Sequence, residues 1–137
     1  MKYLTDYTED LQTKCFNKYN AFFAFSQTQF EEKYTKGTKY VHLGTGLYCP
    51  KYTYKELINE LDTIQSEGIK QDVKDNGAVA IIEREYFNLE TQISMNTDAL
   101  FDRMQPYQNI HPNQFTKETI LQVSKKCFKK AVKNDWF

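Results

Sequence analysis

The chain has 137 residues, a length typical of one domain that buries its own core without metal or disulfide bonds. Aromatic residues make up 15% of it, too many for a disordered segment, and the formal net charge of zero provides no overall positive field for nucleic acid. Its three distant cysteines form no CxxC pair, which argues against a zinc ribbon or a disulfide framework. We therefore expect a single domain over residues 1–137, with reduced thiols, no metal and no cofactor.

Charge is spread unevenly along the chain. Residues 41–105 hold 6 Lys and Arg against 11 Asp and Glu, whereas residues 106–137 hold 6 against 2. Direct nucleic-acid binding is therefore expected only through the basic C-terminal end. No apolar run approaches the roughly 18 residues that span a bilayer, and the acidic start is unlike a signal peptide. The sequence predicts a soluble protein of a host cell's cytoplasm, without membrane contact.

The N-terminal segment predicts a helix over residues 8–19. Thr8 can cap it, and acidic residues follow in its first turn. Leu11, Cys15 and Tyr19 recur at helical spacing as one apolar stripe. Residues 21–25 are a short apolar run that fits either a buried strand or the tail of this helix.

A second helix is predicted from Ser26 to about Tyr34. Ser26 and Gln29 match a capping box, in which the Ser26 hydroxyl accepts from the Gln29 amide and the Gln29 side chain accepts from the Ser26 amide. Phe25 and Phe30 are spaced as a hydrophobic staple around that cap. Gly37 then stops the helix.

The central stretch, residues 40–50, predicts a strand, a tight turn and a second strand. Tyr40 to Leu43 favour a strand, and Gly44-Thr45-Gly46 permits a turn with positive φ. The chain returns over residues 47–49, and Pro50 blocks further pairing.

Helices follow this hairpin. A capping box at Thr53, with Tyr52 and Leu57 as its staple, opens a helix that Gly68 interrupts and that ends at Asn76-Gly77. Residues 78–90 repeat apolar side chains at helical spacing and predict the next helix.

The C-terminal part predicts two more helices. Residues 91–95 are ambiguous and fit an edge strand, and Thr97 caps a short helix over residues 98–104 that ends before Pro106. Residues 106–114 read as a loop. The last helix spans residues 117–133, with Phe115 and Thr116 forming a staple and cap and with four apolar side chains facing inward: Ile120, Val123, Cys127 and Ala131.

These elements predict an α+β fold that is mostly helical. Five or six helices would pack around a small antiparallel hairpin or sheet. Too few strands are present for a doubly wound sheet or a barrel.

Two candidate sites lie in the central stretch. Gly44-Thr45-Gly46 could hold an anion on its backbone amides, but phosphate loops need more glycines and a helix that starts at once, so a hairpin turn is favoured. Cys49 with His42 could act as nucleophile and base if the strands pair. A buried cysteine and a surface histidine remain the simpler interpretation, because no third member is evident.

Two further candidates lie in helices. Glu83, Glu85 and Glu90 do not share one narrow helical face, so a solvated surface is favoured over acid–base work. The last helix carries an exposed stripe of four lysines, Lys126, Lys129, Lys130 and Lys133. The stripe could contact phosphates or an acidic partner. Alternatively, the lysines only stabilise the helix, because cations are favourable at its negative C-terminal end. Trp136 would dock on the core or join an interface.

Several motifs resemble a family of small uncharacterised proteins from bacteriophages and other mobile elements. They are Ala24-Phe25-Ser26, Gln29-Phe30, YVHLGTGLYCP and GIKQDVKDNGAVAIIEREYFNLE, and the resemblance covers about residues 21–90. It implies a phage or mobile-element origin but no known activity. Genes of this kind are often accessory, and some such proteins block host defences.

The leading hypothesis is a non-enzymatic protein that binds a host protein or ribonucleoprotein complex, such as a CRISPR nuclease, and inhibits antiviral defence. The expected contact residues are His42, Gly44, Thr45, Gly46, Tyr48, Arg84 and Asn88, with a second set of Lys126, Lys129, Lys130, Lys133 and Trp136. One alternative is a small-molecule or nucleotide binder that uses the glycine turn and Arg84. Another is a thiol-dependent enzyme built on Cys49 and His42.

Overall fold

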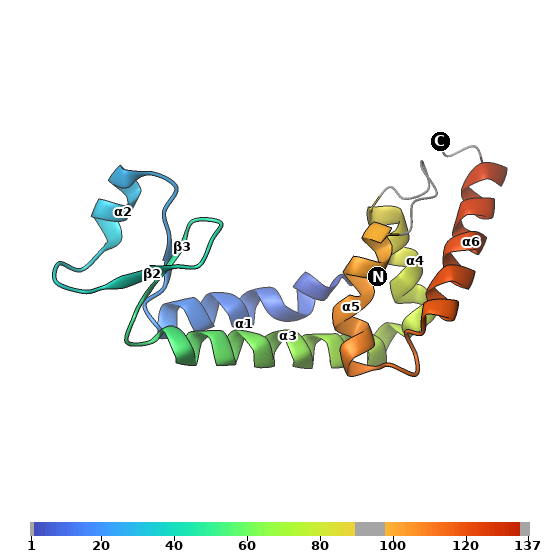
Figure 1. Ribbon diagram of the computed structural model, residues 1–137, viewed down its shortest axis with the longest axis horizontal. Coiled ribbons are helices and arrows are strands. Elements are labelled where there is room, and N and C mark those ends of the chain that lie inside the picture. The colour runs from blue at the N-terminus through green and yellow to red at the C-terminus, as the bar shows by residue number, and fades with distance from the viewer. Residues whose placement is uncertain (1, 90–97, 135–137) are drawn as a thin grey trace. The chain divides into compact units, whose positions relative to one another are not determined.

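A computed structural model describes residues 2–89 and 98–134 of the chain (Figure 1). These residues form six helices and one three-stranded antiparallel sheet, and about 69% of them are helical. The predicted mostly helical α+β class is confirmed. Contacts divide the chain into two compact units, residues 3–68 and the segment from Ile69 onward together with Lys2.

The first unit contains the sheet and the helices around it. Its elements are α1 (Leu4–Lys18), β1 (Phe22–Phe23), α2 (Gln27–Lys33), β2 (Tyr40–His42), β3 (Leu47–Pro50) and the first part of α3 (Tyr54–Asn76). The second unit contains the end of α3, then α4 (Ala78–Asn88), α5 (Asp98–Ile110) and α6 (Lys117–Lys133).

The first helix begins four residues before the predicted position. The amide of Tyr3 donates to the Asp6 carboxylate at 2.8 Å, and this bond takes the place of a Thr8 cap. Thr8 instead lies buried inside α1, with its hydroxyl on the carbonyl of Leu4. Of the predicted apolar stripe, Cys15 is buried but Leu11 is exposed.

The sheet has the order β1-β3-β2, so β3 is the central strand. Its register pairs His42 with Tyr48, Val41 with Cys49, and Phe22 with Tyr48. The strand–turn–strand prediction for residues 40–50 is confirmed, and the open choice for residues 21–25 resolves to a short strand. The prediction that Pro50 blocks further pairing is wrong, because Pro50 pairs with Tyr40 and the Lys51 amide donates to the Lys39 carbonyl one residue further on. On the other side of β3, β1 pairs only with Leu47 and Tyr48, so the missing proline amide interrupts no pairing there.

The two faces of the sheet differ because successive side chains alternate. One face packs into the core of this unit, where Leu47 and Cys49 contact Cys15, Ala21 and Leu57. The opposite face is aromatic, with the centroid of the Phe22 ring lying 5.5 Å from that of Tyr40 and 5.9 Å from that of Tyr48. Phe30 of α2 packs onto Tyr40 and Tyr48, so α2 covers part of this aromatic face.

The start of α2 confirms half of the predicted capping box. The Ser26 hydroxyl accepts from the Gln29 amide at 3.2 Å, as expected. The Gln29 side chain reaches one residue further back and accepts from the Phe25 amide at 2.7 Å. The predicted staple is wrong, because Phe25 is exposed and stacks on Phe23, whereas Phe30 turns into the aromatic face.

Helix α3 is continuous through Gly68, so the predicted interruption is wrong. A Cβ atom at this position would lie 2.5 Å from Cγ2 of Thr8. Glycine is therefore required because α1 passes close to α3, rather than to break the helix. Thr53, predicted as the cap of α3, donates its hydroxyl to the carbonyl of Tyr19 at 2.9 Å.

In the second unit, α4 ends at Asn88 and α6 forms as predicted, with the Thr116 hydroxyl accepting from the Thr119 amide. Its four predicted inward side chains are all buried. Helix α5 continues through Pro106 to Ile110, so the predicted end before Pro106 and the predicted loop from residue 106 are wrong. Proline lacks the amide that would donate to the carbonyl of Asp102, and both residues are exposed, so water can bind that carbonyl. The predictions for residues 91–95 and Thr97 lie outside the described residues.

Candidate binding site

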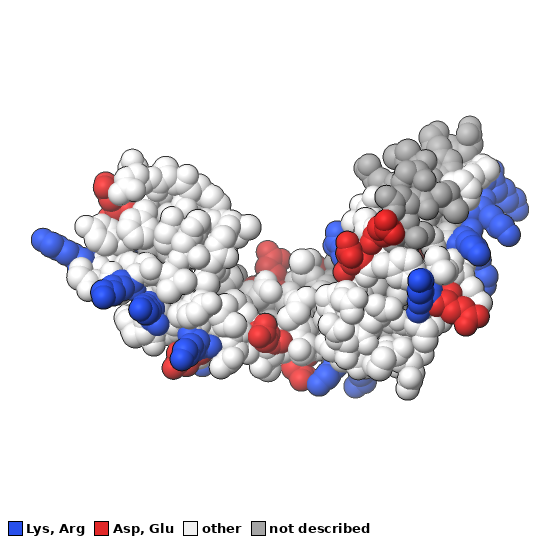
Figure 2. All heavy atoms as spheres, viewed as in Figure 1, with Lys and Arg blue, Asp and Glu red and all other residues white. Residues whose placement is uncertain are grey.

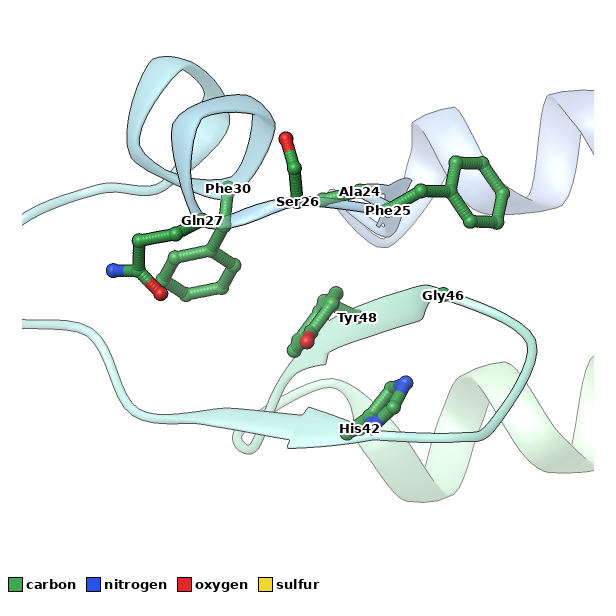
Figure 3. A pocket seen from close by; sticks show the side chains of 8 residues that line it. All are labelled: Ala24, Phe25, Ser26, Gln27, Phe30, His42, Gly46 and Tyr48. Atoms are coloured by element: carbon green, nitrogen blue, oxygen red, sulfur yellow. The ribbon is translucent and has the colours of Figure 1, made fainter.

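A pocket of about 590 Å³ opens on the aromatic face of the sheet, beside the part that α2 covers. Figure 3 shows its walls coming from the β1–α2 segment and from the two strands of the hairpin. The lining residues are Ala24, Phe25, Ser26, Gln27, Phe30, His42, Gly46 and Tyr48. None of them is Asp, Glu, Lys or Arg, so the pocket is suited to uncharged groups.

The floor of the pocket is a ring stack between His42 and Tyr48. Their centroids lie 4.5 Å apart and their planes are inclined by 9°. The stack follows from the register, since the two residues are directly paired and their side chains lie on the same face. Phe30 approaches the Tyr48 ring from α2 with its centroid at 4.9 Å, as Figure 3 shows.

The rim of the pocket holds Phe25, whose exposed fraction is 73%. Its ring stacks on Phe23 with centroids 6.2 Å apart and lies against Gly46. A Cβ atom on Gly46 would lie 2.5 Å from Cε1 of Phe25, so a side chain there would displace the ring. An exposed aromatic ring held by stacking is a typical anchor of binding surfaces.

The glycine turn is a hairpin turn, as the sequence favoured. Gly44, Thr45 and Gly46 all have positive φ, at 84°, 49° and 80°. The Leu47 amide donates to the Gly44 carbonyl at 3.0 Å, and the Gly46 carbonyl accepts from the Ala24 amide at 2.8 Å. These groups join the turn to itself and to β1, and no helix begins before α3 at Tyr54. The turn therefore lacks the helix N-terminus of a phosphate loop.

Cys49 and His42 do not converge. Cys49 neighbours Tyr48 on β3 and points to the core face, whereas His42 lies on the aromatic face. Cys49 is fully buried, with Sγ near the Pro50 carbonyl and the Thr53 hydroxyl. Burial raises the pKa of the other two thiols, to about 12 for Cys15, where Glu60 adds to the effect, and to about 11 for Cys127. These two remain protonated at neutral pH and are weak nucleophiles.

Arg84 belongs to the second unit and is 8% exposed. It forms two bonds to Asp72, at 3.0 and 2.9 Å, and donates to the carbonyl of Lys2 at 2.9 Å. Tyr107 donates to the same Asp72 carboxylate at 2.6 Å. Arg84 is thus part of a buried ion pair in the helical unit. Asn88 lies exposed near the end of α4.

The remaining predicted residues are also in the second unit. Lys126, Lys129, Lys130 and Lys133 are exposed along α6, where Figure 2 shows basic side chains gathered. Trp136 and Glu90 lie outside the described residues. Of the other carboxylates, Glu83 is exposed, whereas Glu85 is buried in an ion pair with Arg84 at 3.0 Å.

Sequence reasoning identified only part of the pocket. It named His42, Gly46 and Tyr48 but interpreted Phe25, Ser26 and Phe30 solely as helix-start residues. The available signal was the alternation of aromatic residues at 40, 42 and 48, which places their rings on one face once the hairpin register is set. Residues 24–27 join the site only through the pairing of β1 with β3.

The fold and pocket define a small α+β protein with an open aromatic site on a three-stranded sheet. Residues 4–132 match the model of the family of unknown function DUF7659, and the chain belongs to this family. The match extends well beyond the resemblance over residues 21–90. No curated protein and no solved structure matches the chain.

Residues 2–89 and 98–134 contain no group of three or more His, Cys, Asp or Glu side chains placed to hold a metal ion. None of their helices has the length and apolar character needed to cross a bilayer.

Proposed function

We propose that this chain is a non-enzymatic binding protein whose sheet pocket recognises a partner protein. The observation that carries the proposal is the open aromatic face, where the His42–Tyr48 stack lies beside the exposed ring of Phe25. The part of this face that α2 leaves uncovered is suited to an apolar side chain of the partner. Aromatic residues at the centre of interfaces contribute most of the binding energy.

The biological role follows from the resemblance of residues 21–90 to phage and mobile-element proteins. In this proposal the chain acts in the cytoplasm of a host cell as an accessory protein. It would occupy a host protein or ribonucleoprotein complex and block an antiviral defence, for which a CRISPR nuclease is one candidate. The resemblance is the support for this role, and the pocket supports the binding step alone.

The test is affinity capture with matched variants, followed by reconstitution. The tagged chain and its Phe25→Ala variant are used to capture proteins from a lysate of the organism that encodes it, and the recovered partner is purified and titrated. We expect a stoichiometric complex that Phe25→Ala weakens at least tenfold, because a hot-spot ring contributes about 2 kcal/mol or more. Leu11→Ala, at an exposed apolar side chain outside this pocket, serves as control. Equal binding by all three proteins would contradict the proposal.

The defence role has its own test. The chain is expressed in cells with an active defence system, and the efficiency of phage plating is measured. Wild type should raise plating, and Phe25→Ala should not. Unchanged plating across several defence systems would remove this role while leaving the binding function intact.

A small-molecule ligand is the second candidate, because about 590 Å³ lies within the usual range of ligand pockets, about 300 to 1,000 Å³. Thermal-shift screening with nucleotides and cyclic nucleotides distinguishes the two. A compound that binds only the native state raises the melting temperature. A shift that Phe25→Ala abolishes would favour the small-molecule function over the protein partner.

A further inference from the structure

A second surface in the first unit lies at the other end of the hairpin strands. Lys39 and Lys51 directly follow the last paired residues, and the Lys51 amide donates to the Lys39 carbonyl at 2.8 Å. The bond continues the register, so these lysines oppose one another across the ladder. Like charges directly opposite one another destabilise a sheet. Both side chains are exposed, and neither forms an ion pair with an acidic side chain among the described residues.

The hairpin and its flanks are strongly basic. Residues 33–55 contain 5 Lys, 5 Tyr and no Asp or Glu, in a chain whose net charge is zero. Figure 2 shows basic side chains over the part of the first unit that Figure 1 labels α2, β2 and β3.

Two hollows meet at this surface. One, of about 450 Å³, is lined by Gly37, Thr38, Lys39, Lys51 and Tyr52. The other, of about 360 Å³, shares Thr38 and Tyr52 with it and adds Lys33 and Tyr40 among its lining residues. The Tyr52 ring is 68% exposed, next in sequence to Lys51. The surface thus combines an unpaired lysine couple with an exposed aromatic ring.

We propose that this surface, Lys39, Lys51 and Tyr52, binds single-stranded nucleic acid. The lysine couple would contact successive backbone phosphates, and a base would stack on the Tyr52 ring. Phosphates beside the two ammonium groups would offset the repulsion between the opposed lysines. Interleaved lysines and tyrosines favour a nucleic-acid strand over an acidic peptide, because every base presents a π-face for stacking.

This surface is distinct from the aromatic pocket, since the two share no lining residue. It is also distinct from the lysine stripe of α6, which belongs to the second unit. A ribonucleoprotein partner would engage both sites of the first unit, but each site can be tested alone.

The test is fluorescence anisotropy with labelled oligo-dT and oligo-U of twelve nucleotides, across a salt series. Lys39→Gln/Lys51→Gln should weaken binding at least tenfold and reduce the slope of log K against log salt by about 1.4, because each phosphate contact on a single strand contributes about 0.7. Tyr52→Ala should weaken binding between about 5-fold and 100-fold, with Tyr52→Phe close to wild type. Phe25→Ala should leave oligonucleotide binding unchanged.

The control with the same charge change is Lys126→Gln/Lys129→Gln on α6. Circular dichroism verifies that every variant is folded. Equal losses for the two double variants would show binding by net charge or through α6, and would overturn the proposal. So would the absence of binding to either oligonucleotide at low salt, an unaffected Tyr52→Ala variant, or tighter binding to a polyglutamate peptide.

Discussion

The rings of His42 and Tyr48 stack across neighbouring strands with their centroids 4.5 Å apart. This contact sets the floor of the pocket and fixes His42 on the opposite face of the sheet from Cys49. The same register thus creates a binding surface and separates the only histidine of the hairpin from its only cysteine. The separation of these two side chains favours a binding role for the sheet over thiol chemistry.

Gly46→Ala is predicted to destabilise the chain more than Gly44→Ala. Both positions have positive φ, so each substitution costs about 1 kcal/mol in backbone strain. Only at Gly46 would the new Cβ also collide with the ring of Phe25, since nothing lies within 4 Å at Gly44. Denaturant unfolding measures both. Adding Phe25→Ala should recover part of the Gly46→Ala loss, and equal losses at the two glycines would contradict the contact.

Gly68→Ala is predicted to destabilise the chain although alanine is the better helix former. Propensity alone favours alanine by about 1 kcal/mol, but its Cβ would lie 2.5 Å from Cγ2 of Thr8. Overpacking typically costs about 1 to 3 kcal/mol. Thr8→Ser removes that methyl group while keeping the hydroxyl, and it should restore stability in the double variant. A stabilised Gly68→Ala single variant, measured by urea unfolding, would refute the close approach of α1 and α3.

Asp72→Asn is predicted to be destabilising, by about 3 kcal/mol, because it removes the charge of the carboxylate that accepts two bonds from the buried Arg84 guanidinium, although the ion pair of Arg84 with Glu85 remains. The solvent-exposed pair of Lys18 and Glu60 provides the comparison, and Glu60→Gln should cost much less, because surface ion pairs are screened by water and salt. Thermal or denaturant unfolding measures both variants. Similar small losses would show that the buried pair is dispensable.

The same pair predicts acid sensitivity. Burial acts to raise the pKa of Asp72, but hydrogen bonds from Arg84, Tyr107 and Asn76 outweigh it and hold that pKa below its usual range. The carboxylate therefore contributes its full stabilisation above the ordinary Asp pKa of about 3.9 and loses it as pH falls further, through the folded-state value. The free energy of unfolding should drop below about pH 3.9. In Asp72→Asn that part of the pH dependence should be absent.

Lys51→Gln is predicted to stabilise the free protein at low salt. It removes one of two like charges that oppose one another beyond the end of the β2–β3 ladder. The gain in melting temperature should disappear at about 1 M salt, where the screening length falls to about 3 Å. Lys36→Gln, in the same basic segment but without an opposed lysine in the ladder, should show a smaller gain. An equal effect of both variants would indicate general charge repulsion.

Local patterns predicted most of the architecture. The hairpin, the helix of α4, and the inward face of α6 all follow from residue spacing and turn chemistry that act within a few positions. The errors arose where a distant segment decides the outcome. The low helix propensity of glycine predicted that Gly68 interrupts the helix, but α3 continues through it. Glycine is needed there because α1 passes too close to leave room for a side chain.

The candidate site shows the same division. His42, Gly46 and Tyr48 could be named from the hairpin, but Phe25 enters the pocket through the pairing of β1 with β3. Nothing in the sequence around Arg84 indicates that it is buried. Its structural role, an ion pair with Asp72 twelve residues away, is evident only from the packing of the helices. Pairings between strands and between helices are the part of the fold that one sequence specifies least.

The central claim is that Phe25 and the His42–Tyr48 stack form the contact surface for a partner protein. The most direct measurement places a photo-crosslinking phenylalanine at position 25 and, as control, at the exposed Leu11, which lies outside this pocket. Irradiation in the producing cells should yield one discrete adduct from position 25 and none from position 11, and the identified protein should bind the purified chain with a defined stoichiometry. No adduct at position 25, or the same adducts from both positions, would contradict the account.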